Sequence, residues 1–275
     1  MEVLYGLHPV EEAVRSGARR LDCVLLARER GDARLERLAG LCRDAGVRVT
    51  LESRDQLTRL ARTDAHQGAV ALVRQRAFLT IEDLLAPLPI ANNLDTIGAD
   101  TLPSHRFFLA LDGIEDPHNL GALLRTADGA GVDGVILPER RSAPVSATVA
   151  KTSAGASEHV RIARVTNLVR ALEQMKQANV WVLGLDERGA PDYMDFDFRT
   201  DCVLVLGREG AGLHDLVKKT CDHLLRIPMA GAVSSLNVSV AGAVVMYEAM
   251  RQRSRPAPAT PKPAAPPKPR KGLGS

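Results

Sequence analysis

The segment from Leu224 to Met250 places polar side chains beside free backbone groups. Its sequence predicts a short buried strand that ends at Pro228, a loop of small residues, and then a helix that is apolar nearly all round. Ser234 or Ser235 is expected to cap that helix, and polar residues continue into its first turn at Asn237. Polar side chains beside exposed backbone amides either cap a helix or hold a polar ligand, and both interpretations stay open at this point.

Two further stretches combine a turn with a polar side chain that could do chemistry. Leu204–Gly212 is a buried strand that runs into a glycine-rich turn containing Glu209. Asp116–Ala127 predicts a turn, a helix cap at Asn119 and a helix that carries Arg125. Taken alone, Arg125 is typical of a solvated helix arginine, and Glu209 of a surface charge favoured by the dipole at a helix start. Only a fold that brings the three stretches together would give these side chains a chemical role.

The glycines of the second stretch do not match a nucleotide-binding loop. Gly207, Gly210 and Gly212 have the spacing G-x-x-G-x-G, whereas a dinucleotide loop has G-x-G-x-x-G at the first strand–helix turn of its domain. The turn also lacks the lysine of a phosphate-binding P-loop. No cluster of His, Cys or acidic residues has the spacing of metal ligands. The sequence therefore disfavours an NAD or ATP enzyme and predicts that no metal is bound.

The elements that must position these residues alternate between short apolar strands and helices from Phe107 onward. This alternation predicts an α/β fold with a mostly parallel sheet that is covered on both faces. The strands are expected at Phe107–Leu111, Val132–Leu137, His159–Ile162, Val180–Leu185, Val203–Leu206 and Leu224–Ile227, and the helices at Leu120–Ala130, Ser146–Ser153, Leu168–Ala178, Leu213–Lys218 and Leu236–Arg251. Ligands of such sheets bind beyond the carboxyl ends of the strands. Gly207 and Pro228 each follow a strand directly, so both loops are expected on that rim.

The rest of the chain divides by composition. Residues 1–75 predict a small α/β domain, with helical patterns at Pro9–Arg15, Leu35–Ala45 and Asp55–Ala61 and strand patterns at Leu21–Ala27, Val47–Leu51 and Gly68–Val73. Residues 76–103 are punctuated by Pro, Asn and Gly and are expected to form a linker with a short helix at Ile81–Leu85. Residues 104–253 form the main domain. Residues 254–275 hold seven prolines and are expected to be disordered.

Composition limits the classes of function. Aromatic residues make up 3% of the chain, so stacking of bases on aromatic side chains is not expected. The tail holds five basic and no acidic residues, so the net charge of +3 leaves a slightly acidic body, and any RNA surface there must be a local patch. The four cysteines include no C-x-x-C pair and are expected to be free thiols. No apolar run reaches the length of a membrane span and no signal-peptide pattern is present, so the sequence predicts a cytoplasmic protein.

Together, the three stretches resemble the signature motifs of the SpoU (TrmH-like) ribose 2′-O-methyltransferases, a family of the SPOUT superfamily. The matching patterns are N-x-G-A-x-x-R from Asn119 to Arg125, L-G-x-E-G-x-G from Leu206 to Gly212, and I-P-M followed by S-L-N-V-S from Ile227 to Ser239. The resemblance implies S-adenosyl-L-methionine as cofactor and a trefoil knot made from the last loops of the parallel sheet. The segments YGLHPVEEAV and HQGAVALV are similar to the N-terminal substrate-binding domain of one branch, which has the fold of the RNA-binding ribosomal protein L30e.

The resemblance also implies a role for individual residues. Those that would hold the adenosine part of the cofactor are Gly207, Ile227 and Leu236, with Met229 nearby. Those that would act on the ribose are Arg125 as the main residue, with Asn119, Glu209, Ser235 and Asn237 to orient it and the substrate. Arg125 is either a general base or a group that binds the adjoining phosphate and stabilises the developing alkoxide. Since an arginine resists deprotonation, we favour the second role.

The wider match includes KTSAGASEHV and RVTNL, and it indicates the branch that methylates a guanosine in the peptidyl-transferase P loop of large-subunit ribosomal RNA. One alternative is a SpoU enzyme for transfer RNA or another ribosomal site, and another is a non-catalytic RNA-binding assembly factor. The intact Asn119, Arg125, Glu209 and Asn237 argue against the assembly factor. Related enzymes are dimers. The expected helix Leu236–Met250 is apolar over more of its surface than packing against one core requires, so a homodimer is expected. His8 and His66 stand in turns before apolar elements and are expected to be structural.

Overall fold

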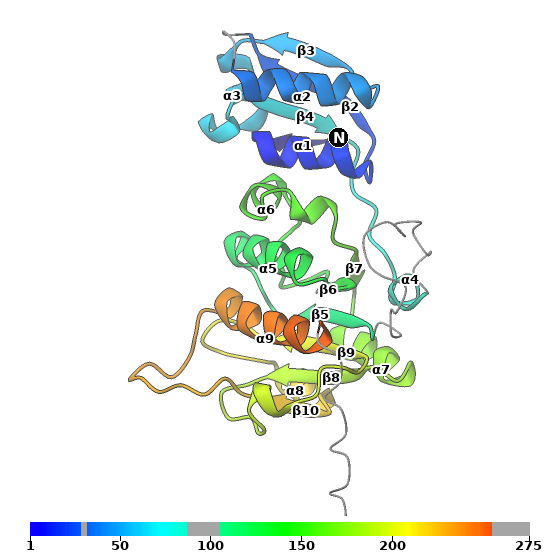
Figure 1. Cartoon of the computed structure of the whole chain (residues 1–275), viewed down its shortest axis with the longest axis vertical. Helices are drawn as coiled ribbons and strands as arrows, with labels where there is room; N and C mark the ends of the chain where they lie inside the picture. Colours follow the sequence, from blue (N-terminus) through cyan, green and yellow to red (C-terminus); the bar gives the residue numbers. More distant parts are fainter. Residues whose placement is uncertain (29–31, 87–104, 255–275) are drawn as a thin grey trace, which may run out of the picture.

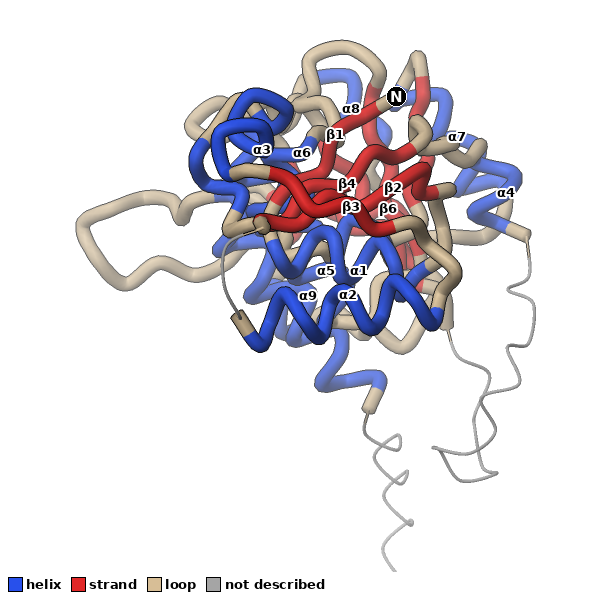
Figure 2. The backbone as a smooth tube through the Cα atoms, turned by 90° about the horizontal axis from the view of Figure 1, so that it is seen from above, coloured by secondary structure: helices blue, strands red, loops and turns tan. Residues whose placement is uncertain are grey.

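Two α/β units follow one another along the long axis of the molecule in the computed structural model, which describes residues 1–28, 32–86 and 105–254 (Figure 1). The smaller, N-terminal unit has a four-stranded sheet in the order β1-β4-β2-β3. Its strands are β1 Glu2–Tyr5, β2 Leu21–Ala27, β3 Val49–Glu52 and β4 Ala69–Val73, and its helices are α1 Leu7–Ser16, α2 Ala33–Asp44, α3 Arg54–Ala61 and the 3₁₀ turn η1 Asp64–His66. Helices α1 and α2 pack side by side against one face of this sheet (Figure 2).

The larger unit is built on a six-stranded sheet in which every pairing is parallel, in the order β10-β8-β9-β5-β6-β7. Its strands are β5 Phe107–Leu111, β6 Gly134–Pro138, β7 Ile162–Val165, β8 Trp181–Leu185, β9 Cys202–Leu206 and β10 His223–Leu225. Its helical segments are α4 Ile81–Leu85, α5 Pro117–Gly129, α6 Ala147–Thr152, η2 Ala156–Glu158, α7 Leu168–Gln177, η3 Tyr193–Asp195, α8 Asp215–Thr220 and α9 Val238–Arg253. The predicted parallel α/β domain and the small α/β domain before it are therefore both confirmed.

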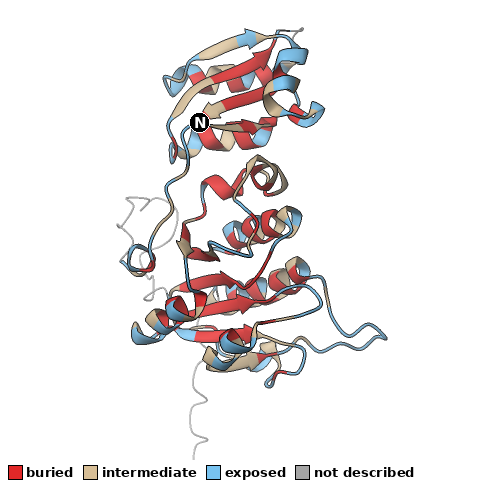
Figure 3. Ribbon diagram, turned by 180° about the vertical axis from the view of Figure 1, so that it is seen from behind, coloured by how far each residue is buried: buried red, intermediate tan, exposed pale blue. Residues whose placement is uncertain are grey.

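Helices cover both faces of the six-stranded sheet, because successive side chains of a strand point to opposite faces. In the central strand β5, Phe107, Leu109 and Leu111 pack on one face with buried residues of α5 and α9. Phe108 and Ala110 pack on the other face with buried residues of α4, α7 and α8. The strands form a continuous buried layer between these helices (Figure 3).

Several element boundaries differ from those expected from sequence. Helix α5 begins at Pro117 and is capped by Asp116, whose carboxylate accepts from His118 N, so the expected cap at Asn119 was wrong. Helix α9 begins at Val238 and is capped by Asn237, so the expected serine cap was also wrong. In both cases several cap-forming residues stand close together, and the packing of the helix decides which one lies at its start.

Two strands were also misjudged. The strand expected at His159–Ile162 begins only at Ile162, because Ala156–Glu158 form the buried turn η2. Strand β1 was missed, since its four residues carry no clear alternation and it is defined by its antiparallel partner β4. The trefoil knot concerns how the last loops thread, which strand order does not describe, so the knot stays a prediction.

The short helix expected within residues 76–103 forms as α4, and it packs into the larger unit. Ile81 and Leu84 are buried in the same cluster as Phe108, and Leu79 forms a β-bridge with Ala163. Residues 76–86 are thus built into the larger unit's core. The rest of the expected linker, like the expected disordered tail, lies outside the described residues, apart from Ser254.

The predictions for His66 and for the cysteines agree with the structure, whereas His8 lies exposed in α1 and its expected structural role stays a prediction. His66 is buried, and its Nδ1 accepts a hydrogen bond from Gly68 N, so it is a structural residue. The four cysteines are free thiols, and burial raises the pKa of both Cys202 and Cys221 to about 12. Among the described helices, none has the length and apolar character needed to cross a membrane.

The packing of α4 leads to a stability test. Leu84 is 1% exposed, so Leu84→Ala should lower the free energy of unfolding by about 2–5 kcal/mol, the range for a buried leucine that leaves a cavity. Leu85→Ala, at the half-buried neighbouring position, is the matched control and should cost clearly less. Urea unfolding of both full-length variants measures the difference. Equal costs would show that α4 is only loosely attached.

Candidate active site

The loop after β9 is a tight backbone turn that only glycine allows. Arg208 N donates to Gly212 O at 3.0 Å, and Gly212 N donates back to Arg208 O at 2.8 Å. Gly210 and Gly212 have φ of +72° and +66°, in the left-handed region that favours glycine. A Cβ on Gly207 would lie 2.2 Å from the carbonyl carbon of Gly212, so a side chain there would force the turn apart. The glycine pattern found in the sequence is therefore a requirement of this turn.

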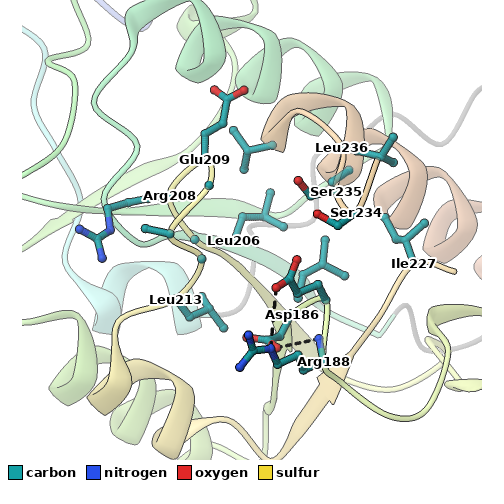
Figure 4. Close-up of a pocket in the computed structure, with 18 of the residues that line it drawn as sticks. Asp186, Arg188, Leu206, Arg208, Glu209, Leu213, Ile227, Ser234, Ser235 and Leu236 are labelled. Carbon is teal, nitrogen blue, oxygen red and sulfur yellow. Dashed lines mark hydrogen bonds and ion pairs between the residues drawn. The ribbon is translucent and has the colours of Figure 1, made fainter. Parts of the chain in front are cut away.

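A cleft of about 390 Å³ lies between this turn and the loop after β10. Leu206 and Leu213 line one part of it, and Ile227, Ser235 and Leu236 line another (Figure 4). Gly207, Glu209 and Met229 also line the cleft. The expected cofactor residues Gly207, Ile227, Met229 and Leu236 thus all border one cleft at the carboxyl rim of the sheet. Its volume falls in the range of roughly 300–1,000 Å³ that small-molecule sites occupy.

Three of the expected polar residues form one hydrogen-bonded group beside the cleft. Asn119 Nδ2 donates to Glu209 Oε2 at 3.2 Å. Asn237 Nδ2 lies 3.1 Å from Asn119 Oδ1 and 3.2 Å from Glu209 Oε1, so it donates to both oxygens. Asn237 Oδ1 accepts from Ser239 N at 2.9 Å and thereby caps α9. The capping interpretation and the ligand-site interpretation of Asn237 are therefore compatible, because its amide oxygen caps the helix while its amide nitrogen donates to Asn119 and Glu209.

Arg125 and Ser235 are not part of this hydrogen-bonded group. Ser235 lines the cleft and is exposed. Arg125 lies on the exposed side of α5 and has no hydrogen bond or ion pair with any described residue. The opposite side of the same helix is buried and carries Leu120, Leu123 and Leu124. Of the expected site residues, the structure thus brings all but Arg125 to the cleft or to its polar group.

Charged residues that follow β8 also line the cleft, and the sequence had not predicted them there. Asp186 and Arg188 line the lower part of the cleft (Figure 4), and Lys218 of α8 donates to Asp186 Oδ2 at 2.7 Å. Burial opposes ionisation of Asp186, but hydrogen bonds from Lys218 Nζ and Arg188 N outweigh it and lower the pKa of this carboxyl. The signal that could have found Asp186 was its place directly after a buried parallel strand, which puts it on the ligand rim.

The lining of the cleft suits a small polar molecule. Among the described residues, no group of His, Cys, Asp and Glu could hold a metal ion. The walls combine apolar side chains with the free peptide groups of a glycine turn, which suits a ligand with both a heterocycle and polar groups.

Fold and cleft together define an α/β protein with a ligand site on the carboxyl rim of a parallel sheet. The family model described as SpoU rRNA Methylase matches residues 106–247, and the model described as RNA 2′-O ribose methyltransferase substrate binding matches residues 3–79. The chain belongs to the SpoU rRNA methylase family.

Individual relatives match nearly the whole chain. It is 42% identical over 253 residues to 23S rRNA (guanosine-2′-O-)-methyltransferase RlmB of Ralstonia nicotianae, covering 92% of this chain and 96% of the relative. It is 39% identical to the RlmB of Escherichia coli K12, covering 92% and 99%. A solved structure of the SpoU methyltransferase AviRb from Streptomyces viridochromogenes, in complex with the cofactor AdoMet, has a TM-score of 0.72 and 25% identity, covering 91% and 90%.

The hydrogen-bonded group predicts a pH-dependent effect at Asn237. Asn237→Asp keeps an oxygen to cap α9, but it places a second carboxylate against Glu209. The two carboxylates repel each other while both are charged, so the folded Asp variant is less stable at neutral pH. This loss of stability disappears as the pH falls below about 4, where carboxyls are protonated. Because both side chains are exposed, the cost should stay within about 1 kcal/mol.

The matched control for this prediction is Asn237→Ser, which can cap the helix without adding charge. Urea unfolding of both variants between acidic and neutral pH measures the effect. A difference between the Asp and Ser variants that does not change with pH would mean that residue 237 and Glu209 do not interact in solution.

Proposed function

We propose that this protein transfers a methyl group from S-adenosyl-L-methionine to the ribose 2′-hydroxyl of a guanosine in 23S ribosomal RNA, at the P loop of the peptidyl-transferase centre. The observation that carries this proposal is the group of Asn119, Glu209 and Asn237, which joins three distant parts of the chain beside the cofactor-sized cleft. The near full-length similarity to enzymes named for guanosine 2′-O-methylation of 23S rRNA supports the choice of substrate.

The cleft suits the proposed cofactor. Peptide groups of Gly207, Ile227 and Leu236 would hold the adenosine part, and the Met229 side chain, 37% exposed, would cover it. A Cβ at Gly207 would clash with the backbone of Gly212, so this position can present only its peptide group to the cleft. S-adenosylmethionine, when bound, supplies an electrophilic methyl group on its sulfonium.

The remaining chemistry consists of positioning and charge stabilisation. Asn119, Glu209 and Asn237 hold one another and would orient the ribose, with Ser235 opposite them on the cleft wall. Arg125 would bind the phosphate next to the target ribose and stabilise the alkoxide that forms as the hydroxyl loses its proton. Its exposed guanidinium pairs with no residue of the described parts of the chain and is available for an anionic group from outside. An arginine at this position stays charged and acts through electrostatics, because its pKa exceeds about 12.

We further propose that the protein acts as a homodimer through the outer side of α9. Val240, Tyr247 and Met250 of this helix are 49%, 51% and 39% exposed, although they are large and apolar. The buried side of α9 already fills the core with Val245 and Met246. The site is also incomplete in one chain, since Arg125 stands apart from the other polar residues. A second copy over this side would cover the apolar residues and lie next to α5.

The smaller unit would bind the RNA substrate, as the matching substrate-binding family model indicates. The tail, residues 254–275, would add phosphate contacts through its basic side chains. We place this activity in the cytoplasm, where the ribosomal RNA substrate is found.

The proposed reaction can be tested with purified protein and unmodified 23S rRNA. Ribose methylation of one guanosine in the P loop should appear with S-adenosylmethionine and persist in EDTA, because no metal takes part. Mapping of ribose methyl groups by resistance to alkaline cleavage gives the position. Methylation of transfer RNA or of another ribosomal site in place of the P loop would overturn the substrate, and loss of activity in EDTA would overturn the metal-free site.

Substitution of Arg125 separates binding from chemistry. Arg125→Ala should leave the affinity for S-adenosylmethionine nearly unchanged, because Arg125 does not line the cleft. Methyl transfer should fall by roughly two orders of magnitude, the scale for loss of one positioned electrostatic contact. Arg125→Lys should recover part of the rate, because it keeps the charge but loses the bidentate fork. A single-turnover rate of the lysine variant that rises through the lysine pKa would instead favour a general base.

The dimer is tested by placing charge on the exposed side of α9. Val240→Glu with Tyr247→Glu should give monomers by light scattering at micromolar concentration and should reduce methyl transfer. Leu51→Glu changes an equally exposed apolar residue of the smaller unit and is the matched control. A wild-type protein that is monomeric and fully active would rule out the proposed assembly.

A further inference from the structure

The larger unit contacts the smaller one through α6 and the residues that follow it, and we call residues Lys151–Val160 the docking segment. It runs from the end of α6 through η2 to the start of β7, and α6 lies between the smaller unit and α5 (Figure 1). We propose that the docking segment transmits the position of the smaller unit to the α5 helix and so sets the position of Asn119 in the active site. This proposal rests on the proposed function and gives Glu158 and Arg19 the role of positioning residues.

A buried ion pair forms the centre of the contact. Arg19 of the smaller unit and Glu158 of the docking segment have side chains that are 2% and 0% exposed, and Arg19 Nε lies 2.8 Å from Glu158 Oε2. The N–H is not aligned with that oxygen, so the contact is an ion pair and not a hydrogen bond. Arg19 Nη1 also pairs with Glu2 Oε2 at 2.6 Å. Buried charges are tolerated only when they remain paired, so this pair favours one orientation of the two units.

A second arginine fixes the same segment from the chain between the units. The guanidinium of Arg76 donates to the carbonyl oxygens of Ser157 and Val160. Burial lowers the pKa of Arg76, while the nearby Glu158 opposes that shift. Glu158 therefore lies near two cations, the buried Arg19 of the smaller unit and the half-buried Arg76 of the connecting chain.

Contacts around this centre are close and polar. Gly155 has φ of +90°, and a Cβ there would lie 2.7 Å from both Cβ and Cγ of Glu12 in α1. Glu12 Oε2 pairs with His159 Nε2 at 2.8 Å. Lys151 Nζ donates to Ala65 O at 2.9 Å and lies 5.6 Å from the centre of the Tyr5 ring. The docking segment is thus held by side chains of β1 and α1 and by a main-chain carbonyl of η1.

Helix α6 connects this contact to the active site. Ala150 is buried in the hydrophobic cluster of the smaller unit, whereas its neighbour Val149 is buried in the cluster beneath α5 and α9. Thr152 packs against α5 so closely that a Cβ on Gly121 would lie 1.8 Å from Thr152 Oγ1. The same hydroxyl lies 3.3 Å from Pro117 O at the start of α5.

Asn119 stands between the two points where Thr152 contacts α5, Pro117 and Gly121. A shift of α6 must therefore move the turn that carries Asn119, because closely packed interiors transmit displacement. Loss of docking would misplace Asn119 relative to Glu209 and lower the rate of methyl transfer even with RNA bound.

The test uses the full-length double variant Arg19→Gln with Glu158→Gln, which removes both charges and keeps similar side-chain volumes. At saturating 23S rRNA, the single-turnover rate of methyl transfer should fall by roughly tenfold to a hundredfold, the scale for misplacement of a reacting group. The affinity for S-adenosylmethionine should stay unchanged, because neither residue lines the cleft. Hydrogen exchange of the amides in the first turn of α5 should speed up even without RNA.

Two further variants make the result specific. Gly121→Ala separates α5 from Thr152 without touching the smaller unit, and it should lower the saturating rate while leaving RNA affinity intact. Glu11→Gln, which removes the exposed Arg15–Glu11 pair from the same α1 helix, is the matched control and should change nothing. Weaker RNA binding with an unchanged saturating rate and unchanged exchange in α5 would overturn the proposal. If wild-type protein fails to methylate 23S rRNA, the proposed function fails, but the exchange measurement still decides whether docking reaches α5.

Discussion

Helix α5 is held between two neighbouring helices by contacts that only glycine allows, and the active site depends on this arrangement. On one side, Thr152 of α6 packs so close to Gly121 that a Cβ would not fit there. On the other side, a Cβ on Gly242 of α9 would lie 2.7 Å from side-chain atoms of Leu123 in α5 and of Leu206 in β9. The position of α5 therefore fixes Asn119 against Glu209 and Asn237, which belong to the loops on either side of the cleft.

The distribution of charge follows from the same packing. The buried ion pair of Arg19 and Glu158 lies at the junction of the two units, away from the cleft. The cost of removing these charges from water is offset only when the two units are placed so that the charges pair. The ionic contacts at the cleft, such as Lys218 with Asp186, are partly exposed and contribute little to stability. Charge thus fixes orientation between the units, whereas hydrophobic burial on the two faces of the sheet provides the stability of each unit.

Patterns in the sequence predicted the order and type of most elements, and three of them, β2, α4 and β5, to the residue. Short apolar runs that alternate with segments of helical periodicity are a local feature of the sequence, and parallel sheets with crossover helices show this feature clearly. The caps were wrong because Asp116 and Asn119, or Ser235 and Asn237, are equally suited locally, and only tertiary packing decides between them. The site residues came from a resemblance to a family, since nothing local connects Asn119 with Glu209, which lies 90 positions away. Asp186 and the Arg19–Glu158 pair were missed because their partners are distant in sequence, although Glu158 lies within the matched segment KTSAGASEHV.

The exposed side of α5 explains why one chain does not contain a complete set of interacting site residues. Its other sides are occupied by the sheet, by α6 below the smaller unit and by α9. Arg125 is therefore left facing outward, next to the side of α9 where Tyr247 reaches Gly129 of α5. A negatively charged partner brought to this face, such as an RNA phosphate, would meet a guanidinium with no internal partner among the described residues. In the proposed assembly, the same helix would contact the smaller unit through α6 and a second copy beside α9, so that substrate docking and assembly would both act on the residues proposed to orient the ribose.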